Sequence, residues 1–304
     1  MGNSRLKILL LGKSGMLGSC FFDFFKNNKE YEFFAYDHDE LDVKDKTLLC
    51  DAFTKSKPDI LINCVAYTNV DLAESERDLA FKINAEAAGE MARLCKEFGA
   101  ILIHFSTDYV FSGEKSEGYK EDDEPKAINV YGESKLEGEK LIMANMEKYY
   151  IVRTSWLFGG QGHAWRRASH NFVDTMIRLG EQAIKDGTEL KIVDDQIGSP
   201  TYTNDLCGAV IKYFLEPARN SKKQLSFGIY HLTNSGTCSW YTFAKKIFEI
   251  KNMNVLVKAV NSAQFLRPAK RPKCSILINN KIPSIRSWEE ALRIYLITVV
   301  EEKL

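Results

Sequence analysis

The amino-acid sequence predicts an α/β protein whose core is a doubly wound parallel sheet. In its first half, apolar runs of strand length alternate with segments whose apolar residues recur at helical spacing. One long helix is expected from about Ala80 to a C-terminal cap at Gly99. Such alternation implies right-handed crossovers, so helices should cover both faces of the sheet. The expected strands cover residues 7–11, 32–36, 59–66, 100–106 and 149–156.

The second half of the chain is less regular and predicts a smaller C-terminal α/β lobe. Its apolar runs are shorter, and a strand expected at residues 229–232 resembles those of the first half. We therefore expect a first domain over residues 1–158 and a lobe, mainly substrate-binding, over 159–304. Elements near 203–232 are expected to return to the first domain.

Charge and cysteine usage exclude several classes of protein. Lysine plus arginine and aspartate plus glutamate number 41 each, so no global field attracts nucleic acid or a membrane surface. No apolar run approaches the ~18 residues of a membrane-spanning helix. The seven cysteines form no C-x-x-C pair, which favours free thiols in a reducing cytoplasm over disulfides or a zinc site.

Three glycines, Gly12, Gly15 and Gly18, follow the first expected strand. A glycine-rich turn from a strand into a helix lets backbone N–H groups approach a pyrophosphate. Asp37 lies at the end of the second expected strand, where an acidic residue binds the adenosine ribose of a dinucleotide. The same glycine spacing also occurs in ordinary tight turns. Its position after a buried strand favours a Rossmann fold that binds NAD(P).

Tyr131 and Lys135 are four residues apart and would share one face of a helix. A nearby ammonium lowers the pKa of a tyrosine, which makes the phenol a workable proton donor. Thr107 ends the fourth expected strand, and ligands bind at the carboxyl ends of strands in such sheets. Each feature also has an explanation without a catalytic role. Tyr131 and Lys135 could lie on a solvated helix face, and Thr107 could hydrogen-bond within a turn at the end of its strand. Their order along one chain favours an active site.

The connecting segments resemble one family of extended short-chain dehydrogenases, the dTDP-4-dehydrorhamnose reductases. The resemblance extends over nearly the whole chain and rests on the segments LLLGKSGMLG, NCVAYTNVDLAE, INAEAAGEMA, FSTDYVFSG, NVYGESKLEGE, VRTSWLFG, NFVDTM, VDDQIGSPTYTNDL and RPAKRPKCSILINNK. It implies hydride transfer from NAD(H) or NADP(H) to the C4 keto group of a nucleotide-linked 6-deoxy sugar, in the biosynthesis of dTDP-rhamnose-like polysaccharide precursors.

The resemblance also implies roles for individual residues. Tyr131 donates the proton, Lys135 lowers its pKa and binds the nicotinamide ribose, and Thr107 polarises the carbonyl. Trp156 and Asn171 match residues at the substrate, although Trp156 could equally be a core aromatic that ends a strand. Besides Tyr131 and Lys135, the residues implied at the cofactor are Gly12, Gly15, Met16, Leu17, Gly18, Asp37, Asp42, Val43, Val65, Ala66 and Tyr67.

Two departures from the family pattern stand out. Residues 163–170 form an insertion with Arg166 and Arg167, which is either a variable surface loop or a clamp for the substrate diphosphate. His38 follows Asp37 where an arginine would favour NADP, so NAD or dual use is expected, although Lys13 could still reach a 2′-phosphate. Some relatives use a divalent metal, but no acidic ligand set matches, and no metal is expected.

Three other functions are alternatives to a reductase for this sequence. A 4,6-dehydratase needs Asp-Glu after the threonine, and here Asp108 is followed by Tyr109. A nucleotide-sugar 4-epimerase could share every catalytic residue. A non-catalytic subunit resembling the regulatory subunit of methionine adenosyltransferase would not need Thr107, Tyr131 and Lys135 intact. The expected partner is a nucleotide-diphosphate sugar. The sequence does not determine the oligomeric state, and it is compatible with a homodimer.

Overall fold

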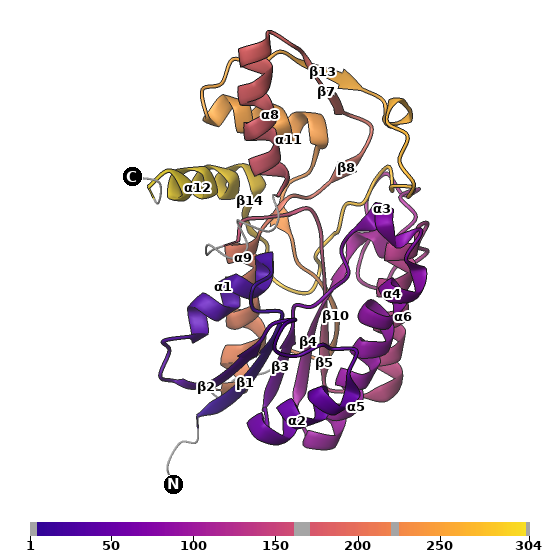
Figure 1. The fold of residues 1–304 in the computed structure, drawn as a ribbon, viewed down its shortest axis with the longest axis vertical. Helices are drawn as coiled ribbons and strands as arrows, with labels where there is room; N and C mark the ends of the chain where they lie inside the picture. The colour runs from indigo at the N-terminus through magenta and orange to yellow at the C-terminus, as the bar shows by residue number, and fades with distance from the viewer. Residues whose placement is uncertain (1–4, 161–170, 220–224, 302–304) are drawn as a thin grey trace.

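The computed structural model describes residues 5–160, 171–219 and 225–301. Its centre is a six-stranded sheet in which every neighbouring pair is parallel. The predicted doubly wound α/β fold is thereby confirmed (Figure 1). In spatial order the strands are β10 (Gly228–His231), β5 (Tyr149–Thr154), β4 (Ile101–Thr107), β3 (Ile60–Asn63), β1 (Leu6–Leu11) and β2 (Tyr31–Tyr36).

Successive side chains of each strand point to opposite faces of the sheet, and helices bury them on both faces. Ile8 and Leu10 of β1 lie in one apolar cluster with helices α1 (Met16–Phe25) and α9 (Thr203–Val210) and the π-helix η3 (Ile211–Leu215). Leu9 and Leu11 lie in a second cluster on the other face, with helices α2 (Lys46–Ser56), α5 (Ala87–Phe98) and α6 (Val130–Asn145). Both clusters contain residues that are fully buried.

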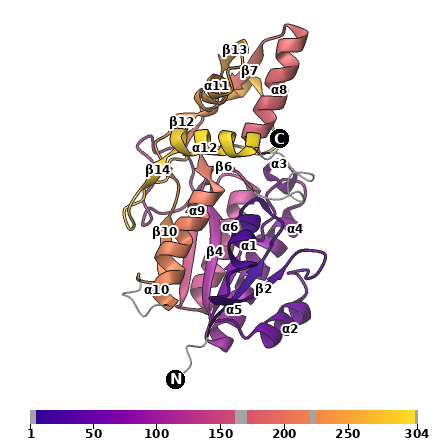
Figure 2. The same cartoon turned by 90° about the vertical axis from the view of Figure 1, so that its left-hand side faces the viewer.

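A smaller lobe stands beyond the C-terminal ends of the strands (Figures 1 and 2). Strands β7 and β13 pair in parallel within it. Phe158, Phe243 and Trp288 belong to its separate apolar core. Helix α12 lies between the sheet and the rest of this lobe (Figure 2). The elements of the lobe are α8 (Phe172–Asp186), β7 (Leu190–Val193), α11 (Trp240–Ile250), β13 (Val257–Val260) and α12 (Trp288–Glu301).

Short elements connect these layers. The helical ones are α3 (Val70–Ala73), α4 (Arg77–Phe81), the π-helix η1 (Lys82–Glu86), the 3-10 helices η2 (Asp108–Val110) and η4 (Ser262–Gln264), and α10 (Glu216–Arg219). The strands are β6 (Leu157–Phe158), β8 (Ile197–Gly198), β9 (Thr201–Tyr202), β11 (Asn234–Ser235), β12 (Cys238–Ser239) and β14 (Ile285–Ser287). In the described part of the chain, no helix combines the length and apolarity needed to cross a bilayer.

The expected boundaries differ from the observed ones by more than one residue in three places. The third strand ends at Asn63, because the chain leaves the sheet to line a cavity. The fifth strand ends at Thr154, and Trp156 adopts a positive φ of 47° that no strand residue takes. The long helix begins at Arg77, and the π-helix η1 interrupts it before α5.

Candidate active site

A cavity of about 290 Å³ opens where β1, β2 and β3 end. The strand order reverses between β1 and β3, which is the place where doubly wound sheets bind their ligands. Seven of the expected cofactor residues line this cavity: Gly12, Gly15, Asp37, Asp42, Val43, Val65 and Ala66. Met16, Leu17, Gly18 and Tyr67 are not among its lining residues.

The glycine turn has a shape that larger residues would block. Gly12 has a φ of +81°, and its N–H donates to the carbonyl oxygen of Tyr36 at 2.9 Å. A Cβ on Gly18 would lie 1.9 Å from the carbonyl oxygen of Gly12, so α1 can approach the turn only with glycine there. Gly15 is the N-cap of α1, and no acidic side chain stands in the helix's first turn. Backbone N–H groups at a helix N-terminus beside the cavity fit a pyrophosphate.

Charged residues at the end of β2 surround the place expected for the adenosine ribose. Asp37 and His38 line the cavity, and the Asp37 N–H donates to Glu40 Oε2 at 2.8 Å. Lys13 Nζ lies 2.8 Å from Glu40 Oε1. This hydrogen bond is the main reason why the pKa of Glu40 is lowered. The ammonium that could meet a 2′-phosphate is therefore already paired with a carboxylate of the same chain.

Thr107 and Tyr131 come together beyond the end of β4. Thr107 is buried, caps η2, and its hydroxyl donates to Asp108 Oδ1 at 3.0 Å. Tyr131 lies in the first turn of α6, with its phenol close enough to the Thr107 hydroxyl for Thr107 to lower its pKa. The Tyr131 ring meets the Tyr109 ring edge-on at 5.8 Å between centroids. A hydroxyl and a phenol are thus positioned to share one substrate oxygen.

Burial governs the ionisation of the two titratable residues in this group. It raises the pKa of Tyr131 to about 12, against an opposing hydrogen bond from Thr107. It lowers the pKa of Lys135 to about 8. Lys135 is not among the causes of the shift of Tyr131, and its expected lowering of the pKa of Tyr131 stays a prediction. Lys135 Nζ instead donates to the Phe105 carbonyl oxygen at 2.7 Å, on the sheet side of the helix.

Asp108 is a buried carboxylic acid beside Thr107. Burial raises its pKa to about 6. Its Oδ2 has no hydrogen-bond partner among the described residues. A carboxylate so poorly solvated holds a proton far more readily than a surface aspartate, and the hydroxyl of Thr107 lies directly against it.

The residues expected at the substrate lie in the smaller lobe or at its border. The half-buried indole of Trp156 stacks on Trp240, with centroids 3.5 Å apart and an interplanar angle of 7°. Asn171 is the N-cap of α8, and its amide donates to Gly159 O at 3.2 Å and Tyr295 Oη at 3.0 Å. The capping role is sufficient to explain why an asparagine stands at position 171. A contact of Asn171 with the substrate stays a prediction. The insertion with Arg166 and Arg167 lies outside the described residues.

Tyr67 is connected to the catalytic helix through a residue that the sequence did not single out. Asn84, in the π-helix η1, accepts from the Tyr67 N–H at 2.8 Å and donates to Ser134 Oγ of α6 at 2.9 Å. Helix α6 approaches so closely that a Cβ on Gly138 would lie 2.1 Å from the Asn84 carbonyl oxygen. Nothing in the helical periodicity marks a π turn, so this contact could not be read from the sequence.

Other residues that line the cavity or lie behind it were not predicted from the sequence. Ser14 stands inside the glycine turn and could have been found from its position there. Glu40, His104 and Asn63 carry no local motif, because they act through residues distant in sequence. The cavity residues without an assigned role are Leu11, Ser14, Tyr36, Leu41, Lys44, Cys64 and Ile83.

Comparison with known proteins agrees with this geometry. Residues 6–300 match the family model described as the RmlD substrate binding domain. The chain belongs to this family. A dTDP-4-dehydrorhamnose reductase from Aggregatibacter actinomycetemcomitans is 36% identical over 94% of this chain and 97% of its own. The spore coat polysaccharide biosynthesis protein SpsK of Bacillus subtilis (strain 168) is 38% identical over 95% of this chain and 96% of its own.

A solved member of the family has the same fold. The crystal structure of dTDP-4-dehydrorhamnose reductase from Bacillus anthracis str. Ames, in complex with NADP, is 41% identical to this chain. It superposes with a TM-score of 0.86 and covers 97% of this chain and 99% of its own. The family resemblance expected from the sequence is confirmed over both the sheet and the smaller lobe.

Proposed function

We propose that this protein reduces the C4 keto group of a nucleotide-activated 6-deoxy-4-keto sugar, such as dTDP-4-dehydrorhamnose, with hydride from NADH or NADPH. The juxtaposition of Thr107 and Tyr131, beyond the end of β4, carries this proposal. Val65 lines the cavity, and hydrogen bonds through Asn63 and His104 connect it to Lys135. The cavity and the candidate catalytic residues therefore form one site.

Each residue has a task that its position supports. A bound nicotinamide cofactor supplies the hydride. Tyr131 donates its phenolic proton to the C4 carbonyl oxygen. The Thr107 hydroxyl turns its proton from Asp108 Oδ1 to the same oxygen and donates a hydrogen bond to it. Lys135 meets the nicotinamide ribose once its amine leaves the Phe105 carbonyl. Trp156 and Asn171 are assigned to the sugar side of the site.

The cofactor occupies the cavity at the ends of β1 to β3. Gly12, Gly15 and Gly18 keep the turn open for the pyrophosphate, with Met16 and Leu17 beginning the helix behind it. Asp37 accepts the ribose hydroxyls, Asp42 and Val43 border the adenine, and Val65, Ala66 and Tyr67 flank the centre of the cofactor.

The chain divides by task, with residues 1–158 and the elements near 203–232 holding the cofactor and the rest of 159–304 holding the sugar. Strand β10 belongs to the main sheet, and α9 shares an apolar cluster with α1, which supports this division. All seven cysteines are free thiols, which fits the reducing cytoplasm that we assign to the reaction.

A turnover assay tests the function directly. NADH and NADPH are each offered with a panel of nucleotide-linked 4-keto-6-deoxy sugars, and oxidation of the cofactor is followed with analysis of the sugar product. We expect stoichiometric formation of the 4-hydroxy sugar. Interconversion of 4-hydroxy sugars without net cofactor oxidation would identify an epimerase. Stable association with methionine adenosyltransferase and no turnover would identify a regulatory subunit.

A further inference from the structure

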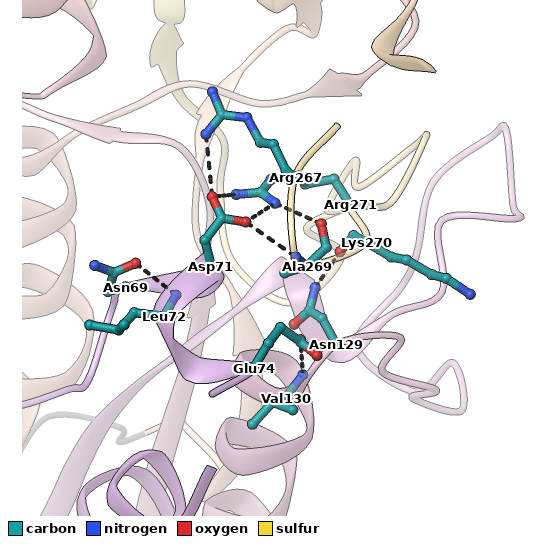
Figure 3. Close-up of polar contacts among 10 residues, drawn as sticks. All are labelled: Asn69, Asp71, Leu72, Glu74, Asn129, Val130, Arg267, Ala269, Lys270 and Arg271. Atoms are coloured by element: carbon teal, nitrogen blue, oxygen red, sulfur yellow. Dashed lines mark hydrogen bonds and ion pairs between the residues drawn. The ribbon is translucent and has the colours of Figure 1, made fainter. Parts of the chain in front are cut away.

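A segment near the C-terminus, residues 267–273, lies against α3 and the start of α6 (Figure 3). We call this segment the strap. It follows α6 by more than a hundred residues in sequence, yet it contacts the first turn of the helix that carries Tyr131 and Lys135. The family resemblance gives its residues no task.

Asp71 of α3 anchors the strap through four contacts. Arg271 donates to both carboxylate oxygens, at 2.6 Å and 2.8 Å. Arg267 donates at 3.3 Å and the Ala269 N–H at 3.2 Å (Figure 3). The hydrogen bond with Arg271 is the main reason why the pKa of Asp71 is lowered to about 2. Two parallel N–H···O bonds fix orientation as well as distance, which a single surface ion pair does not.

The strap in turn holds the side chain that caps α6. Asn129 is buried, and its Nδ2 donates to the Lys270 carbonyl oxygen at 2.7 Å. Its Oδ1 is thereby directed at the Gly132 N–H, 2.8 Å away. Glu74, just past α3, accepts from the Val130 N–H at 2.9 Å. Two N–H groups at the start of α6 therefore have acceptors. Val130 donates to Glu74, and Gly132 donates to Asn129, whose side chain the strap holds.

Tyr131 stands between the two residues that these contacts hold. A Cβ on Gly132 would lie 2.1 Å from the Tyr109 carbonyl oxygen, so the helix start is packed without clearance against η2. A small rotation of this turn would move the Tyr131 phenol away from Thr107. Misplacement of a reacting group by about 1 Å can cost about a hundredfold in rate.

The strap also reaches the other side of the site. Its last residue, Lys273, accepts from the Ile197 N–H of β8 at 2.8 Å. Gly198, the next residue, lies directly against the indole of Trp156. One short segment therefore connects the helix that carries Tyr131 to the strand that supports the aromatic residue at the sugar side.

We propose that Asp71 is a positioning residue for the reaction, which anchors the strap and through Lys270 and Asn129 fixes the helix start that carries Tyr131. The inference rests on the proposed function for its kinetic consequence. Its structural part, the connection from Asp71 through the strap to the start of α6, depends only on the hydrogen bonds described above.

Substitution of Asp71 by asparagine tests the proposal. We expect kcat to fall at least tenfold, while the Kd of NADH and NADPH stays within about twofold, because neither Asp71 nor any strap residue lines the cavity at β1 to β3. Asp71→Glu keeps the charge and should recover part of kcat. Glu90→Gln is the matched control, because Glu90 of α5 also accepts two bonds from one arginine, at 3.0 Å and 2.7 Å, but away from the strap.

Hydrogen exchange of the amides at 130–136 gives a readout that needs no turnover. Asp71→Asn should speed exchange there, and Glu90→Gln should not. Unchanged exchange in Asp71→Asn would overturn the proposal, as would a loss confined to KM with kcat intact, or a lowered Tm with normal kcat. If the wild-type protein reduces none of the sugars, the proposed function fails while the exchange experiment still decides whether Asp71 holds the helix.

Discussion

Lys135 Nζ lies 3.2 Å from Nε2 of His104, and both side chains are fully buried. The other ring nitrogen of His104 faces Asn63 Nδ2 at 3.0 Å. The Asn63 Oδ1 accepts from the Val65 N–H, so its NH₂ group must point at the histidine. His104 Nδ1 is then an acceptor, and Nε2 carries the ring proton. Only a neutral amine on Lys135 can accept that proton, so this contact favours the uncharged amine and opposes the ammonium form.

Turnover should therefore depend on pH through Lys135. Burial lowers the pKa of its amine to about 8, while Glu139 and Cys64 oppose the shift. The ammonium form is present below this value and is lost as the pH rises through it. Because the charged form is the one that favours the Tyr131 phenolate, we expect kcat/KM to fall above about pH 8. The profile reports the coupled site as a whole. A flat profile to about pH 9.5, with circular dichroism unchanged, would contradict this.

Tyr131→Phe removes the proton donor and little else. We expect kcat to fall by roughly 10²–10⁴-fold, the usual contribution of a positioned acid, with the Kd of the cofactor nearly unchanged. Tyr149→Phe is the control, because Tyr149 begins β5 at the opposite end of the sheet. Single-turnover measurement separates the chemical step from product release. A near-normal rate in Tyr131→Phe would remove this residue from the mechanism.

The layers of the fold could be predicted because their causes are local. Apolar runs of strand length and a glycine turn before a helix are visible within about ten residues of sequence. The ion pair of Asp71 with Arg271 joins residues 200 positions apart and leaves no periodic pattern. The positive φ of Trp156 likewise accompanies contacts with residues distant in sequence, the stack on Trp240 and the close approach of Gly198.

The candidate site divides in the same way. Gly12, Asp37 and Val65 stand at the ends of strands, where the motif order predicts them, and the structure brings them to one cavity. The ionisation of the catalytic group could not be predicted, because it depends on burial. Spacing alone suggests that Lys135 faces Tyr131, whereas its amine contacts Phe105 and His104.

The choice between NADH and NADPH should depend on Glu40 as well as on Asp37. Glu40 occupies the ammonium of Lys13, so Glu40→Gln frees that cation for a 2′-phosphate. We expect the ratio of kcat/KM for NADPH over NADH to rise about two- to fivefold, the upper range of one solvent-exposed ion pair. Lys13→Ala in the same background should abolish the gain. Glu32→Gln, whose partner Lys7 lies 3.9 Å away on the neighbouring strand β1, is the control. An unchanged ratio in Glu40→Gln would show that Lys13 does not reach the phosphate.

Gly198→Ala should weaken binding of the sugar through Trp156. A Cβ at this position would lie 2.4 Å from Cε2 of the indole, so the ring must shift or the strand must move. A shifted ring loses its stack on Trp240. Closely stacked indoles couple through their strong far-ultraviolet transitions, and this coupling is visible in the circular dichroism spectrum. We expect that coupling to diminish and KM for the sugar to rise severalfold, while the Kd of the cofactor is unchanged. Gly208→Ala is the matched control, because no atom lies within 4 Å of a Cβ built there. Loss of the coupled signal with a normal KM would assign Trp156 to the core of the lobe and remove it from the substrate site.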